Sequence, residues 1–141
     1  MQNQNIISLK RILVIALLFM TIGTAMELYL LSHYEDFNQL IPLIILALGL
    51  LFALIIIRWP TSLFKRLFKL VLVLMALSGI YGTYLHLQAN YEFELEMTPT
   101  ASGLDLFVES LSGALPALAP ASMIVLALLG YSYLILLKQQ E

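Results

Sequence analysis

Four long apolar stretches alternate with short polar connections along the chain. They cover residues 12–31, 40–57, 67–87 and 114–137. Each is close to the roughly 20 residues that an α-helix needs to cross about 30 Å of hydrocarbon. Helices also pair their own backbone groups, which lipid cannot do. The pattern therefore predicts an all-α membrane protein, a four-transmembrane-helix antiparallel bundle in which residues 1–141 form a single transmembrane domain.

The longest polar connection, residues 88–112, contains two further patterns. From Tyr91 to Met97, apolar side chains alternate with glutamates, which is the period of an extended strand with one covered face. After Pro99, residues 102–111 read as a short interfacial helix with Ser102 as its N-cap. We therefore expect a short extended segment and an interfacial helix in this outer loop. The helix would carry an apolar face made of Leu104, Phe107, Val108 and Leu111.

Two prolines near the start of the fourth apolar stretch leave its first turn open to two interpretations. Proline is tolerated in the first turn of a helix, so the helix could begin at Pro116 and kink at Pro120. It could equally begin only near Pro120, which leaves about 18 residues for the crossing and is still sufficient. The first stretch continues past Gly23 to Leu31, so we expect a retained span there and not a cleaved secretory signal.

The composition agrees with a membrane protein, since 61% of the residues are hydrophobic and only 11% are charged. The chain contains no cysteine, which excludes disulfides, thiol catalysis and thiolate metal ligation. No phosphate-binding glycine loop or nucleophile elbow is present. The basic residues lie next to the apolar stretches and form no nucleic-acid surface.

The basic and acidic residues are distributed very unevenly between the two predicted sides of the membrane. By the positive-inside rule this sidedness predicts an integral protein of the bacterial cytoplasmic membrane, with both termini cytoplasmic and an acidic periplasmic loop. All seven basic residues fall on one predicted side, and eight of the nine acidic residues fall on the other side or at that end of a helix. The basic residues are Lys10, Arg11, Arg58, Lys65, Arg66, Lys69 and Lys138.

Three residues in the predicted outer half are candidates for chemistry, namely Glu27, His33 and His86. An ionisable group inside a span faces the bundle interior or water by default, and small and polar residues such as Gly23 share its side of the helix, so we expect Glu27 to point inward. Glu27 and His33 lie about 120° apart on a helix, so Glu27 pairs better with His86, and His33 with Asp36. Imidazole and carboxylate ligands suit a divalent metal, and two histidines could ligate haem. No ligand-spacing motif supports either, and capping of helix ends is the simpler role for both histidines.

The sequence leaves the function open between three interpretations. The first is a non-enzymatic accessory or assembly subunit that presents an acidic outer face to a membrane or outer-side protein partner. The second is a redox or transport protein that binds a metal or haem through Glu27, His33 and His86. The third is a proton-coupled carrier working through Glu27, which requires a homo-oligomer because four helices rarely enclose a pathway. For the first interpretation, the candidate partner-binding residues are Glu92, Glu94, Glu96, Asp105 and Glu109.

Overall fold

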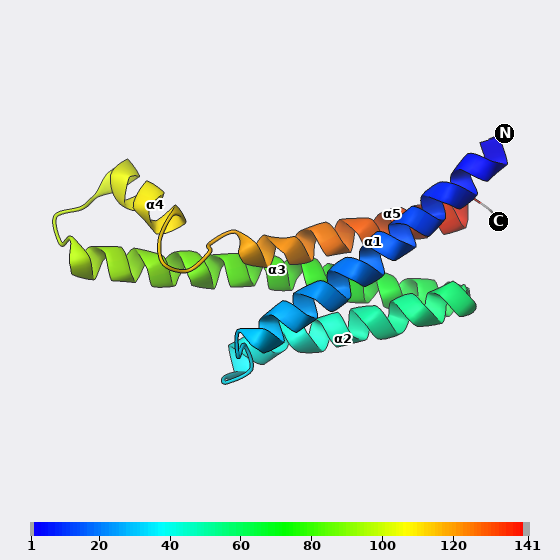
Figure 1. Ribbon diagram of the computed structural model, residues 1–141, viewed down its shortest axis with the longest axis horizontal. Coiled ribbons are helices and arrows are strands. Elements are labelled where there is room, and N and C mark those ends of the chain that lie inside the picture. Colours follow the sequence, from blue (N-terminus) through cyan, green and yellow to red (C-terminus); the bar gives the residue numbers. More distant parts are fainter. Residues whose placement is uncertain (1, 140–141) are drawn as a thin grey trace.

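The computed structural model describes residues 2–139, all of which lie in helices, turns and loops (Figure 1). Three segments are long and apolar enough to cross a membrane: Gln4–Leu30, Phe37–Arg58 and Ala119–Lys138. This finding confirms the prediction of an all-helical chain and is consistent with an integral membrane protein. The elements in chain order are α1 (Gln2–Leu30), α2 (Phe37–Arg58), α3 (Ser62–Met97), α4 (Gly103–Leu111), the short 3-10 helix η1 (Ala119–Ala121) and α5 (Ser122–Lys138).

The third predicted span, residues 67–87, lies inside α3, which is not among these three segments. α3 has 36 residues and is therefore about 54 Å long. It continues without a break to Met97, so the predicted extended segment from Tyr91 to Met97 is wrong. No strand occurs within residues 2–139.

The helical path of residues 91–97 has a simple physical reason. These residues include neither glycine nor proline, and continuing the helix pairs every backbone amide, whereas a lone strand would leave its ladder groups unpaired. α3 ends at Met97. Its C-cap Thr98 precedes Pro99 and has φ −134° and ψ 79°, a non-helical backbone conformation of the kind that a following proline favours. The N–H of Thr98 still donates to the carbonyl oxygen of Glu94 at 2.8 Å.

The helices define two ends of the molecule (Figure 1). The start of α1, the end of α5 and the connection between α2 and α3 lie at one end, together with the seven basic residues; we call it the basic end. The connection between α1 and α2 lies at the opposite, acidic end, and α3 and α4 extend well beyond it. At the basic end, the ammonium groups of Lys10 and Lys69 lie 5.9 and 5.8 Å from the ring centres of Tyr133 and Tyr131. These contacts join α1 and α3 to the last turns of α5.

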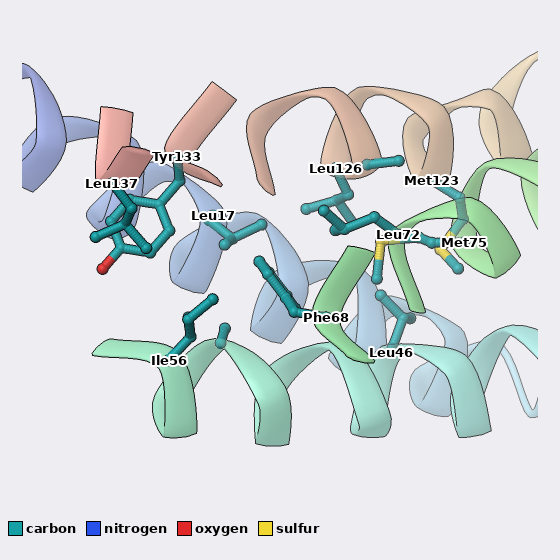
Figure 2. Close-up of a cluster of buried hydrophobic side chains, with 12 residues drawn as sticks. Leu17, Leu46, Ile56, Phe68, Leu72, Met75, Met123, Leu126, Tyr133 and Leu137 are labelled. Carbon is teal, nitrogen blue, oxygen red and sulfur yellow. The ribbon is translucent and has the colours of Figure 1, made fainter. Parts of the chain in front are cut away.

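The core lies where α3 packs against both α2 and α5 (Figure 2). Phe68 and Met75 of α3 are almost completely buried, between Leu46 and Ile56 of α2 and Leu126 of α5. Small residues let the helices approach closely, as expected for membrane helices. A Cβ atom on Gly130 of α5 would collide with the side chain of Leu72 of α3, for example.

α5 begins late, as the second interpretation of its two prolines predicted. Residues 112–118 are not regular helix, and η1 starts at Ala119 with Pro120 in its first turn. The chain here lies directly on α3, since a Cβ atom on Gly79 would meet the carbonyl oxygen of Pro120 at 2.9 Å. A Cβ on Gly82 would likewise meet Pro120 Cβ at 2.8 Å. Two glycines of α3 therefore make room for the proline that opens α5.

Candidate functional site

The turn between α1 and α2 places His33 at the acidic end. The N–H of His33 donates to Leu28 O at 2.9 Å, and the N–H of Ser32 donates to Tyr29 O at 3.1 Å. This pair of bonds ends α1 in the way usually completed by a left-handed glycine. Here Ser32 takes that conformation, with φ 55°. Asp36 then caps α2, its Oδ1 accepting the N–H of Gln39 at 3.0 Å.

His86 lies on the part of α3 that approaches this turn. Its ring is half-buried, and its Nδ1 lies 3.2 Å from the carbonyl oxygen of Pro116. Because a carbonyl oxygen can only accept, Nδ1 must be the protonated nitrogen in this bond. The Nε2 lone pair of the neutral ring is then left to accept a proton, a hydrogen bond or a metal ion. His86 thus joins α3 to the loop before α5.

The structure brings the two histidines close enough to interact; we call His33 and His86 the histidine pair. Burial lowers the pKa of His33 below its ordinary value of 6.5, and the charge of His86 lowers this pKa further. The carboxylate of Asp36 acts in the opposite direction and raises it. The folded protein therefore favours the neutral form of His33 more than the unfolded chain does.

This shift predicts a loss of stability in mild acid. The folded-state pKa of His33 is depressed, so below about pH 6.5 the unfolded chain binds more protons and the free energy of unfolding falls. We expect the thermal unfolding midpoint in detergent to drop between about pH 7.5 and 5.5. The drop should be smaller in His33→Gln and in His86→Gln, which removes one of the two charges. An identical drop in wild type and His33→Gln would contradict the assignment.

The surroundings of Glu27 differ from those of the histidine pair. Its side chain is exposed on α1, contrary to the expected inward orientation, and no hydrogen bond or ion pair joins it to another residue in the described part of the chain. Within residues 2–139, no group of three or more histidine, aspartate and glutamate side chains is arranged to hold a metal ion. Metal or haem binding by Glu27, His33 and His86 thus stays a prediction.

A buried asparagine organises the region beyond the histidines. Asn90 of α3 is 2% exposed, and its Nδ2 donates to the carbonyl oxygens of Ser110 at 2.9 Å and Leu115 at 2.8 Å. Its Oδ1 accepts the N–H of Leu115 at 3.0 Å. One side chain therefore satisfies one backbone group of α4 and two of the loop that follows it. We call residues 88–115, held together by this side chain, the projection.

Gly113 completes this arrangement, because the chain there lies directly against the asparagine. A Cβ atom at position 113 would come within 2.6 Å of Asn90 Cγ and 2.9 Å of its Nδ2. Neither residue was among the candidates from the sequence. A lone asparagine within a helical stretch and a glycine in a loop are common, and only the fold shows that they meet. The one available signal was a polar residue without an obvious role at the end of an apolar helix.

α4 packs on α3 through a different face from the one expected. Leu106 and Ser110 are buried, and the Ser110 hydroxyl donates to Leu106 O at 2.7 Å. The predicted apolar face is left open instead, with Leu104 74% exposed and Phe107 and Val108 each 52% exposed.

The predicted partner-binding carboxylates lie on the last turns of α3 and on α4 itself. Glu94 is half-buried, and the other four are exposed. On α3, the amide of Gln88 donates to Glu92 Oε1 at 2.9 Å, one helical turn away. A shallow hollow of about 250 Å³ between α3 and α4 is lined by Tyr84, Leu87, Tyr91 and Phe107, with Gln88 and Ser110. The projection thus combines exposed apolar side chains with negative charge.

Comparison with known proteins adds no family to this description. No protein-family model, no curated protein sequence and no solved structure matches this chain. The function must therefore be inferred from the chain's own residues.

Proposed function

We propose that this chain is a small polytopic membrane protein, a non-enzymatic accessory or assembly subunit, whose projection binds a basic segment of a protein partner on the outer side of a bacterial cytoplasmic membrane. In this proposal α1, α2, α3 and α5 form an antiparallel bundle of four spans. Residues 70–87 of α3 contain no Asp, Glu, Lys or Arg, which supports α3 as the fourth span. The seven basic residues at the opposite end favour cytoplasmic termini.

The observation that carries the proposal is the open apolar face of α4 on a firmly held helix. Exposed contiguous apolar surface on an ordered element is typical of interaction sites. α4 is ordered by the buried hydrogen bonds of Asn90, and yet Leu104, Phe107 and Val108 remain exposed. If α4 served only to cover α3, these three apolar side chains would be expected to pack against α3. The exposed face is therefore available for a second surface.

The exposed carboxylates of the projection indicate which kind of partner surface would bind to α4. Asp105 and Glu109 lie one turn apart on α4, and Glu92 and Glu96 are exposed on the last turns of α3. No Lys or Arg occurs between Lys69 and Lys138, so nothing in the projection neutralises these carboxylates with a basic side chain. Charge complementarity favours a basic protein segment. The same charge disfavours anionic lipid headgroups as the cover of α4.

Photocrosslinking in the native membrane tests the proposal. A photoreactive benzoylphenylalanine in place of Phe107 should give one discrete protein adduct, whereas the same group in place of Leu51, exposed on the apolar α2, should give none. Neutralising α4 with Asp105→Asn and Glu109→Gln should lower the adduct yield roughly fivefold, as expected for the loss of two exposed ion pairs.

Glu35→Gln is the matched control, because it removes an exposed carboxylate outside the projection and should leave the yield unchanged. Adducts with lipid alone at position 107 would contradict the proposal. An adduct that forms equally well without the two carboxylates would contradict the basic character of the partner.

A further inference from the structure

A second surface, inside the apolar part of the molecule, surrounds the exposed carboxylate of Glu27. Glu27 lies sixteen positions after Arg11 and three before the end of α1, about 24 Å from the basic end and about 4.5 Å from the acidic end of the helix. It falls inside the Gln4–Leu30 segment that is apolar enough to cross a membrane. Its carboxylate would thus lie in the outer third of the bilayer.

Exposed apolar side chains accompany Glu27 on the outer part of α1. Ile22, Met26 and Leu30 are 47%, 59% and 76% exposed. Among the residues that the structure describes, none gives the Glu27 carboxylate a hydrogen bond or an ion pair. A charged group at this depth costs a few kcal/mol when it faces lipid. A basic side chain from outside this chain would offset that cost.

The shape of the surface suits a helix. Gly23 lies one turn before Glu27 on the same side of α1, is exposed, and has no atom within 4 Å of where a Cβ would lie. A glycine at such a position lets a second backbone approach closely. Beside it, a groove of about 650 Å³ runs between α1 and α2, with Ile22, Met26 and Leu43 among its almost entirely apolar lining.

The negative charge of Glu27 indicates which kind of helix would bind beside it. All seven basic residues of this chain lie at the basic end, so a second copy in the same orientation has no Lys or Arg at the depth of Glu27. Two copies meeting there would place two carboxylates against each other. A helix from a different protein can supply a cation at that depth.

We propose that the outer third of α1 is a docking surface for a transmembrane helix of another protein, which presents a basic side chain to Glu27. The Glu27 carboxylate would pair with that side chain, Gly23 would permit close contact, and the α1–α2 groove would receive apolar side chains. The surface shares no residue with the projection, so each proposal is tested by its own variants.

A defined peptide tests this proposal. The probe is a synthetic leucine–alanine transmembrane helix with one lysine a turn from its outer end, compared with peptides carrying leucine there or lysine at the inner end. The full chain has no cysteine, so a Gln139→Cys variant takes a single fluorophore for energy-transfer measurements in phosphatidylcholine vesicles. We expect the outer-lysine peptide to bind about tenfold more tightly than either control peptide, the ratio given by a typical buried polar helix contact.

Substitutions in the chain separate Glu27 from general charge attraction. Glu27→Gln should abolish the preference for the outer lysine, and Glu35→Gln, which removes a carboxylate from the turn outside the span, should retain it. Equal binding of all three peptides would overturn the proposal, as would a preference that persists in Glu27→Gln. A Glu27-dependent homodimer without lysine preference would also overturn it, in favour of a second copy.

Discussion

Replacing Asn90 with leucine is expected to release α4 from α3. The substitution keeps a similar volume but leaves Ser110 O, Leu115 O and Leu115 N–H without their partner. A buried backbone group left unpaired costs about 1–3 kcal/mol. The bond to Ser110 O is buried and the two bonds to Leu115 are part-buried, so we expect a total loss of about 3 kcal/mol. That is large for a nine-residue helix that packs on α3 alone. Hydrogen exchange of residues 103–115 should therefore accelerate strongly, with the core of α3 and α5 unaffected.

Two further variants make this prediction specific. Asn90→Asp keeps the shape and one acceptor but loses both donated hydrogen bonds, so it should release α4 nearly as well as leucine does. Gln88→Leu removes an exposed hydrogen bond on the same helix and should change little. Unchanged protection of α4 in Asn90→Leu would show that the asparagine does not hold the projection together.

Adding one methyl group to Gly79 is expected to destabilise the packing of α3 against α5. The new Cβ would lie 2.9 Å from Pro120 O, 3.0 Å from Ile124 Cγ1 and 3.1 Å from Met123 Cβ. The proline oxygen belongs to the backbone and can move only if η1 moves. Overpacking of this kind typically costs 1–3 kcal/mol, and we expect about 2 kcal/mol for Gly79→Ala.

Gly23→Ala is the matched control for Gly79→Ala. A Cβ at position 23 meets nothing within 4 Å, so the helix gains the ordinary preference of alanine over glycine, about 0.5–1 kcal/mol. The two variants should thus shift the unfolding free energy in opposite directions when both are measured in the same detergent. Equal stability of both variants would contradict the close contact between α3 and Pro120.

The helices could be predicted from the sequence because their signal is local. Apolar stretches of sufficient length identify α1, α2 and α5 directly, and Pro99 correctly marks the end of the region from Tyr91 to Met97. The conformation of that region could not be read from its alternation. Seven residues of period two compete with a helix that is already formed and needs only to continue.

The arrangement of the candidate sites depends on contacts that no local pattern reveals. Asn90 and Gly113 are 23 positions apart, and their meeting follows only from the way α4 turns back on α3. Glu27 was expected to point inward because small and polar residues share its side of the helix. Such residues also occur on a side that faces outward, as the open Gly23 shows, so the helical period alone could not decide the direction.

Both proposals require the acidic end of the molecule to lie outside the cytoplasm, and the labelling of single cysteines tests this most directly. The chain contains no cysteine, so Glu109→Cys on α4 and Ser62→Cys at the start of α3 each give one exposed thiol. In intact spheroplasts, a membrane-impermeant maleimide should label position 109 at once and position 62 only after the membrane is opened. Labelling of position 62 in intact spheroplasts, with position 109 protected until lysis, would contradict the proposed orientation and with it both proposals.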